Sequence, residues 1–458
     1  MQYAGFILSI IVIIIVAKLL LKNYFPQAVL LIAGITLLLI KGGLDYFNHT
    51  IVLEENSFLL INIFEFIKES FSSTNANVGL MIMAIGGFVA YIDKIGASEA
   101  LVRIALKPLS FLKKQPHLAA VCVVPIGQLL FICVPSAAGL GLLLMASVFP
   151  ILINLGVSRL AAVSIITSST AFCIGPASVI TASATQIANI ETVPYFINMQ
   201  IPIAIILNIV VMISYFFVNK YYDKKDKLMP LVDAKIEKQI IQAPAIYGII
   251  PILPLIILLL FSGVFTVFPI KLKIETTTAM LISLFIAVIF ELIRTKNIKN
   301  ILSSFKIFFD GMGDIFKTVV TLIIAAEIFA NGLISIGFID GLITISQGLG
   351  FGAIGLGIIM TIMIFFAAIL MGSGNAAFFA FGPLIPNAAA KFGIASTSIL
   401  LPMNLSASMG RALSPLAGVL LATAEIAGVS SMAIVKRNLI PISLSLLTLL
   451  IYHFGLCF

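Results

Sequence analysis

Long apolar runs recur along the whole of this 458-residue chain. A run of 18 or more apolar residues can cross the hydrocarbon core of a membrane as a helix. Charged residues are only 10% of the chain, whereas soluble domains carry about 25%. The pattern therefore predicts an all-helical protein that crosses the membrane many times. The expected apolar spans are 3–21, 26–41, 77–93, 118–134, 136–155, 159–190, 197–219, 244–268, 274–293, 315–334, 352–371, 373–390, 396–428 and 437–456.

Composition excludes several other classes. The net charge of +8 comes from short basic clusters between apolar spans, which is typical of cytoplasmic loops and not of a nucleic-acid surface. The cysteines and histidines lack metal-ligand spacing, so we expect no metal, no cofactor and no nucleic-acid partner. These residues are Cys122, Cys133, Cys173, Cys457, His49, His117 and His453. The first run, 3–21, lacks a basic start and a cleavage site, which favours a retained helix over a signal peptide.

Two spans, 159–190 and 396–428, are too long for one straight crossing of a ~30 Å core. Each has a proline near its middle, in Gly175-Pro176 and in Ser414-Pro415. Proline interrupts a helix because it lacks an N–H and its ring clashes with the preceding turn. We therefore expect helix breaks at Gly175, Pro176 and Pro415.

Two pairs of spans are joined by very short connections, 134–139 (VPSAAG) and 371–375 (MGSGN). These residue types favour turns. The pattern predicts two re-entrant helical hairpins whose tips lie inside the membrane, where only protein or a water-filled cavity can satisfy irregular backbone.

Basic residues indicate the orientation of the chain. They cluster at 18–22, 94–114, 220–243, 294–306 and 436–437, which places these segments in the cytoplasm. Both termini are then periplasmic. The same sidedness would follow if each hairpin crossed the membrane completely, so the charges support the orientation without proving re-entrance.

The two halves share residues at a nearly constant spacing, which drifts only from 241 to 236 to 239 residues. The first half begins outside and the second inside, so the repeat is inverted. Inverted repeats with broken helices are typical of secondary transporters that bind substrate at the repeat interface. The matches are 88–96 (FVAYIDKIG) with 329–337 (FANGLISIG), 149–157 with 385–394, and 169–176 with 408–415.

The repeat divides the chain into residues 1–219, a basic cytoplasmic linker 220–243, and residues 244–458. The first repeat is expected to contain scaffold helices 3–93, an amphipathic arm 94–114, hairpin 118–155, broken helix 159–190 and helix 197–219. The second is expected to contain scaffold helices 244–334, arm 336–350, hairpin 352–390, broken helix 396–428 and helix 437–456. The hairpins, broken helices and last helices (118–219 and 352–456) form the expected transport domain, which would move against a scaffold of mainly 3–93 and 274–334.

Each hairpin tip begins a helix, with unpaired N–H groups and the positive end of a helix dipole. Two such ends near mid-membrane suit an anion with a carboxylate at either end. For any single hydroxyl near a tip or break, the alternative is a bond back to its own helix. The candidate substrate-binding residues are Ser136, Ala137, Gly139, Thr170, Ser373, Gly374, Asn375, Ser408, Arg411 and Ser414.

Two charged residues lie well inside apolar spans, where an unpaired charge is costly. Arg411 either binds a substrate carboxylate, which its planar guanidinium suits, or makes a structural ion pair or a contact to hairpin carbonyls. Glu327 carries a coupling proton, bonds a neighbouring helix, or pairs with Arg411. The sequence leaves these alternatives open.

Four motifs together resemble the DcuC family of anaerobic C4-dicarboxylate carriers, and the similarity extends over essentially the whole chain. The motifs are 139–150 (GLGLLLMASVFP), 156–159 (GVSR), 372–376 (GSGNA) and 410–415 (GRALSP). The resemblance implies about ten transmembrane helices plus two re-entrant hairpins, a homodimer in the bacterial inner membrane, and an elevator mechanism.

The resemblance also implies succinate, fumarate and malate as substrates, often with net succinate export. Ser136, Ser373, Gly374 and Asn375 would face the substrate. The distantly similar INDY-type carriers have Ser-Asn-Thr at both tips with sodium beside them, and this chain departs from that pattern. The coupling ion, H⁺ or Na⁺, therefore stays open.

Other functions are less well supported. A carrier of the same fold for another organic anion, a short monocarboxylate or an amino acid, is the main alternative. The spans contain no paired aspartates, His-rich set or Ser–His pair, so we expect no enzyme. Broken hairpins also differ from the carbonyl or carboxylate rings of ion channels.

Overall fold

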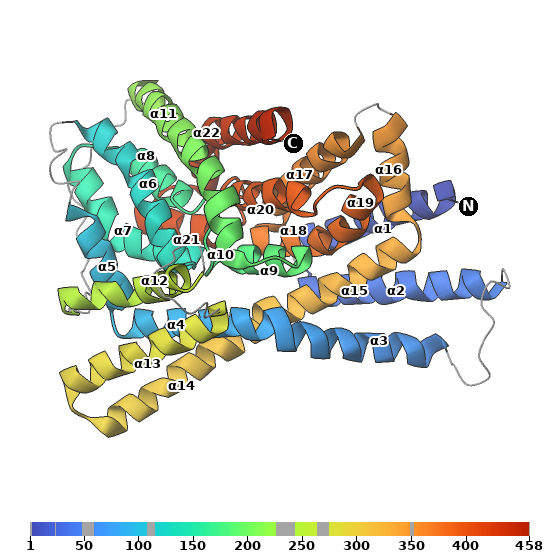
Figure 1. Cartoon of the computed structure of the whole chain (residues 1–458). Coiled ribbons are helices and arrows are strands. Elements are labelled where there is room, and N and C mark those ends of the chain that lie inside the picture. Colours follow the sequence, from blue (N-terminus) through green and yellow to red (C-terminus); the bar gives the residue numbers. More distant parts are fainter. Residues whose placement is uncertain are drawn as a thin grey trace.

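The computed structural model describes residues 2–22, 24–47, 59–107, 115–225, 243–262, 274–348 and 352–457, and the regular structure in these ranges is helical (Figure 1). Nine continuous helical segments within them are long and apolar enough to cross a membrane. This confirms the predicted class, an all-helical multi-pass membrane protein.

The helices of the first half are α1 (Gln2–Leu21), α2 (Pro26–Phe47), α3 (Leu59–Thr74), α4 (Leu80–Lys94), α5 (Ala97–Ala105), α6 (Pro116–Cys133), α7 (Ala137–Asn154), α8 (Arg159–Ser168), α9 (Val179–Ala188), α10 (Thr192–Tyr195) and α11 (Ile201–Lys225). The π-helical turn η1 (Asn75–Gly79) joins α3 to α4, and the π-helical turn η3 (Phe196–Gln200) joins α10 to α11.

The second half begins with the 3₁₀ helix η4 (Ala245–Ile252), which runs into α12 (Leu253–Leu260). Its other helices are α13 (Thr276–Thr295), α14 (Ile298–Ile315), α15 (Thr321–Ser335), α16 (Phe338–Gly348), α17 (Gly352–Met371), α18 (Gly374–Phe381), α19 (Ile385–Phe392), α20 (Thr397–Ala412), α21 (Gly418–Ala427) and α22 (Ser431–Tyr452). The π-helical turns η5 (Phe316–Val320) and η7 (His453–Cys457) and the 3₁₀ turn η6 (Gly382–Leu384) complete the set.

The long predicted spans are interrupted, and the short connections join pairs of helices. Re-entrance of the hairpins stays a prediction. Span 159–190 is split into α8 and α9, and span 396–428 into α20 and α21. Gly175 in the first break has φ of +100°, which a residue with a side chain rarely adopts. The hairpins are α6 with α7, and α17 with α18 and α19.

Several predicted spans are shorter than the helices that contain them. Residues 77–93 are the end of a 35-residue helix, Leu60–Lys94, and 315–334 the end of a 38-residue helix, Ile298–Ser335. The predictions stopped at charges such as Glu69 and Lys306, but these side chains are exposed, so a helix can carry them without burying charge. The last helix begins at Ser431 and not at 437, because Arg437 is buried with an acidic partner.

Both predicted arms contain a helix, α5 within 94–114 and α16 within 336–350. The predicted linker 220–243 is helical as far as Lys225. Residues 108–114, 226–242 and 349–351, which include the rest of these segments, lie outside the described residues.

The first group of helices consists of two long crossed helices, α3–η1–α4 and α14–η5–α15, and of the helices that pack around them, such as α2 and α13. In Figure 1 these helices lie in the lower part of the molecule, where α4 packs on α14 and α2 on α15. The turns η1 and η5 touch each other. The close approach needs glycine, since a Cβ on Gly87 would lie 2.7 Å from the carbonyl oxygen of Phe308.

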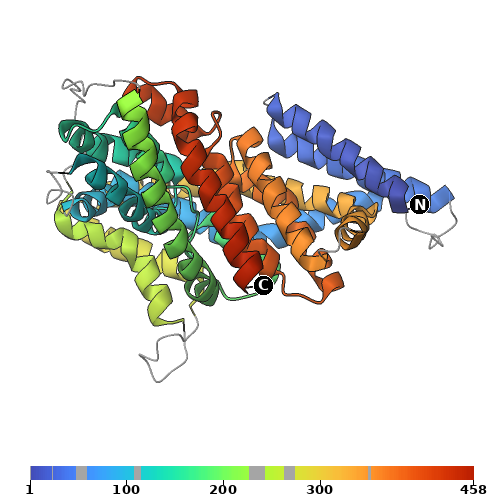
Figure 2. The ribbon, with the colours of Figure 1, turned by 90° about the horizontal axis from the view of Figure 1, so that it is seen from above.

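The hairpins and broken helices pack into a second group. α17 packs on α20, α7 on α8 and α21, and α22 on α8. The long helices α11 and α22 lie side by side, as Figure 2 shows. The second group meets the first where α18 packs on α15.

Local geometry recurs at the spacing of the sequence repeat. The π-helical turns begin at Asn75 and, 241 residues later, at Phe316. Gly96 and Gly337, also 241 residues apart, both have positive φ, +77° and +90°. The chain therefore repeats its backbone irregularities as well as some of its residues.

Candidate functional site

Each hairpin tip presents a serine-capped helix N-terminus. The Ser136 hydroxyl oxygen accepts from the N–H of Gly139 at 3.1 Å, and Ser373 accepts from the N–H of Ala376 at 3.2 Å. Both serines are half-buried. A hydroxyl that accepts in this way keeps its own hydrogen free to donate. Together with the first N–H groups of α7 and α18, each tip can therefore bind one carboxylate.

The tips pack against the helix breaks of their own halves. A Cβ on Gly175 would lie 2.8 Å from a side-chain carbon of Ile132, next to the first tip. At the second tip, a Cβ on Gly374 would lie 2.7 Å from the carbonyl oxygen of Ala407 in α20. Glycine at these positions lets the tip and the broken helix come into direct contact.

Buried amides connect the two breaks. Gln200 accepts from the N–H of Gly175 at 3.0 Å and donates to Thr181 at 2.9 Å and to Oδ1 of Asn404 at 2.7 Å. Asn404 donates in turn to the carbonyl oxygen of Cys173 at 3.1 Å. The first break is thus held by a residue of α20 from the other half.

A second amide makes the reciprocal connection. Asn438 of α22 donates to the carbonyl oxygen of Ala412 at 3.0 Å and to the hydroxyl of Thr167 at 3.3 Å. Its Oδ1 accepts from Tyr215 at 2.7 Å, and Tyr215 is also hydrogen-bonded to Ser168. The second break is therefore tied to α8 and α11 of the first half.

Several predicted hydroxyls are bonded locally. Thr170 donates to the Thr167 carbonyl at 3.0 Å, and Ser408 donates to the Asn404 carbonyl at 3.4 Å. Ser414 accepts from the N–H of Leu416 at 3.3 Å. All three are buried. They shape the breaks, and a role for them in substrate binding remains a prediction.

Arg411 connects three predicted features. It donates to the carbonyl oxygen of Thr170 in the first break, and its guanidinium lies 5.9 Å from the ring centroid of Phe131 in the first hairpin. No ion pair of Arg411 occurs within the described residues, and Glu327 instead accepts from Thr74 at 2.6 Å. Arg411 therefore places an unneutralised positive charge where the breaks meet.

Cavities lie between the two helix groups. One of about 650 Å³ is bounded by η1, α9, α10, α12 and α13, and a second of about 280 Å³ shares Asn77 and Gln186 with it. A third of about 320 Å³ opens at the second tip, beside Ser373. The space at the first tip, beside Cys133 and Pro135, is only about 10 Å³. There is therefore more free space beside Ser373 than beside Cys133 and Pro135.

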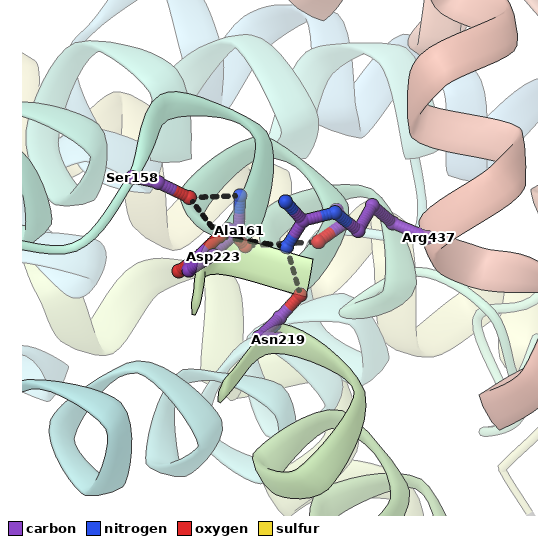
Figure 3. A network of polar contacts seen from close by, with 6 residues as sticks. Ser158, Ala161, Asn219, Asp223 and Arg437 are labelled. Carbon is purple, nitrogen blue, oxygen red and sulfur yellow. Dashed lines mark hydrogen bonds and ion pairs between the residues drawn. The ribbon is translucent and has the colours of Figure 1, made fainter. Parts of the chain in front are cut away.

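A buried ion pair lies at the opposite end of α8. Arg437 of α22 donates to Asp223 at 2.8 Å and to Asn219 at 3.2 Å (Figure 3). Asp223 also accepts from Ser158, whose hydroxyl oxygen caps α8 by accepting from the N–H of Ala161. This network joins α8, α11 and α22 away from the tips.

Gln200, Asn404, Tyr215 and Asn438 were not among the residues predicted from the sequence. Each is a polar residue within an apolar span, and each is buried. A polar residue within an apolar span could be seen in the sequence, and such a residue needs a partner inside the membrane. Its burial and its partners, several of which come from the other half of the chain, could not.

Comparisons with known proteins agree with this architecture. Residues 5–457 match the family described as DcuC, C4-dicarboxylate anaerobic carrier. A probable anaerobic C4-dicarboxylate transporter DcuC of Vibrio cholerae is 35% identical, covering 97% of this chain and 96% of that protein. The anaerobic C4-dicarboxylate transporter DcuC of Escherichia coli K12 is 33% identical, covering 98% and 96%.

A solved structure shares the fold. The YdaH transporter of Alcanivorax borkumensis superimposes with a TM-score of 0.58 at 13% identity, covering 95% of this chain and 99% of that one. Full-length similarity to the DcuC transporters, on a fold shared with another transporter, establishes that this chain belongs to the DcuC family of membrane transporters and is not an enzyme.

Proposed function

We propose that the protein is a secondary active carrier of C4-dicarboxylates, succinate, fumarate and malate, across the bacterial inner membrane. The observation that carries the proposal is the pair of serine-capped helix N-termini at Ser136 and Ser373, each packed on a helix break. The names of the full-length relatives support the substrate class.

Substrate recognition follows from the chemistry of the tips. One carboxylate would accept from the first-turn N–H groups and the serine hydroxyl of α7, and the other from those of α18. Asn375 adds an amide donor at the second tip. Arg411, with no acidic partner among the described residues, supplies a positive charge that favours an anion where the breaks meet.

The proposed movement is that of an elevator. The hairpins are taken as re-entrant parts of two inverted repeats, and 118–219 with 352–456 as the domain that moves against 3–93 with 274–334. The amide bridges through Asn404 and Asn438 would keep the moving domain rigid. We place both termini in the periplasm and expect a homodimer and succinate efflux or exchange.

Purified protein in liposomes tests the proposal. Vesicles loaded with unlabelled succinate should accumulate labelled succinate by exchange, and external fumarate and malate should compete while lactate does not. If lactate or an amino acid exchanges and succinate does not, the alternative, a carrier of the same fold for another organic anion, is correct.

A further inference from the structure

Glu327 lines a cavity between the two helix groups, and half of the residues around this cavity are polar. Its Oε2 accepts from the hydroxyl of Thr74 at 2.6 Å, and the cavity beside it has a volume of about 280 Å³. The π-helical turn η1 begins directly after Thr74. Such turns widen a helix locally and are frequent at functional sites.

The two walls of this cavity come from different helix groups. Ser73, Thr74 and Asn77 of α3 and η1 lie on the same side as Glu327 of α15, in the proposed scaffold. The opposite wall belongs to the proposed transport domain. It consists of Ser183, Gln186 and Ile187 of α9 with Phe379, Pro383 and Pro386 of α18, η6 and α19.

Glu327 forms no ion pair within the described part of the chain, and no other titratable side chain lines the cavity. Other charged residues lie on the helices that surround the cavity or pack against α15, but their side chains are not part of the cavity lining. They are Lys41 and Asp45 on α2, Glu65, Lys68 and Glu69 on α3, Lys317 on η5, Asp340 on α16 and Lys391 on α19. Lys41 pairs with Asp45, and Lys391 with Asp340.

We propose that Glu327 is a proton-binding site that controls the movement of α9 and α18 past α15. An ionised carboxylate is stabilised by the hydroxyl of Thr74 and faces Ser183 and Gln186 of α9 across the cavity. Movement of this wall would take the polar side chains of α9 away and leave apolar residues such as Phe379 and Pro383 opposite the carboxylate, where burying a charge is costly. A protonated carboxyl group can make the same passage, because it is neutral and can donate as well as accept. The proposal rests on the elevator movement proposed above.

The effect of Glu327 protonation on the movement can be measured by succinate exchange at equal pH on both sides of the vesicle membrane, so that no proton gradient is present. For the parent protein, the exchange rate should fall about tenfold per pH unit above the midpoint of the profile, as the protonated fraction does. Glu327→Gln, which is neutral and similar in shape, should exchange at a rate independent of pH. Thr74→Val removes a donor to the carboxylate, so it should move the midpoint to higher pH.

Glu69→Gln is the matched control, since Glu69 is an exposed acid on the same helix as Thr74. It should keep the parent profile. If Glu327→Gln also keeps the parent profile, the proposal is wrong. If Glu327→Gln removes a dependence on sodium and leaves the pH profile intact, the ion is sodium and the proton assignment is wrong.

A cross-link separates this proposal from the substrate assignment. Ser183→Cys and Ile323→Cys, introduced together after replacement of the native cysteines, place thiols on opposite walls of the cavity. Their cross-linking rate should depend on pH with Glu327 present and lose that dependence in Glu327→Gln, with no substrate added. A cross-linking rate with the same pH dependence in both overturns the proposal, whatever the protein transports.

Discussion

The side-chain amide of Gln200 donates to Oδ1 of Asn404 across 2.7 Å, and this bond joins the two halves of the chain. Gln200 accepts from the N–H of Gly175, and Asn404 donates to the carbonyl oxygen of Cys173. Both amides are buried. The conformation of the first helix break is thus set jointly by α20 and by the π-helical turn η3 that leads into α11.

Removing either amide should destabilise the protein. Gln200→Ala and Asn404→Ala each leave buried groups without a partner, at about 1–3 kcal/mol. The two amides belong to one hydrogen-bond network. We therefore expect the double variant to lose about 0.5–3 kcal/mol less stability than the two single variants lose together. Thermal unfolding in detergent measures all three variants. Asn208→Ala is the control, since Asn208 donates only to Ala204 of its own helix, and additive losses for the first pair would contradict the network.

Gly374→Ala should push the second tip away from α20. The new methyl group would lie 2.7 Å from the backbone oxygen of Ala407, which cannot move aside as a side chain can. Transport should fall at least tenfold, an effect of about 1.4 kcal/mol or more. Gly313→Ala is the control, because its Cβ would meet nothing within 4 Å. Equal transport by both variants would show that the tip does not need this contact.

Arg411 is expected to recognise the anion. Arg411→Lys keeps the charge but loses the planar fork, so succinate should bind roughly ten- to a hundredfold more weakly. Arg411→Ala should lose transport, and its residual binding should no longer favour two carboxylates over one. Ligand titration of the purified variants measures binding, and uptake into liposomes measures transport.

Thermal unfolding without ligand is the control for Arg411. The bond to Thr170 gives this residue a structural role as well. If Arg411→Ala prevents folding, or transports succinate as well as the parent, then Arg411 does not recognise the substrate and the site consists of the tips alone.

The buried ion pair should matter for stability and not for recognition. Asp223→Asn removes the acid that is paired with Arg437, whose side chain is only 2% exposed, and should cost about 3–5 kcal/mol. The exposed pair of Asp340 with Lys391 is the comparison, and Asp340→Asn should cost less than about 1 kcal/mol. The KM for succinate of the surviving Asp223→Asn protein should equal that of the parent. A large change in KM would place this network in the transport cycle.

Features governed by local chemistry could be predicted from the sequence. Gly175-Pro176 and Pro415 cannot continue a helix, so both breaks follow from residue type and span length. The caps at Ser136 and Ser373 follow from a hydroxyl directly before an apolar run. Charge was a poorer guide to helix ends, because an exposed Glu69 and a paired Arg437 both lie within helices.

Features that depend on distant partners could not be predicted. Arg411 was expected to meet a substrate carboxylate, an acid or hairpin carbonyls, and it donates to the carbonyl of Thr170, 241 residues away. Glu327 was left with three alternatives, and only the folded chain brings it to Thr74, 253 residues away. Every residue has a backbone carbonyl and threonines are common, so the sequence does not show which of them will be the partner. These pairings can be identified only in the folded structure.

We expect one dicarboxylate to bind to both hairpin tips at once. Ala138 and Asn375 occupy the second position of α7 and α18, so single cysteines there report on each tip without removing a serine cap. In a background without native cysteines, succinate should slow maleimide labelling at both positions, lactate should not protect both, and neither should affect Gly313→Cys. Labelling at either tip that proceeds at the same rate with and without saturating succinate would contradict the account.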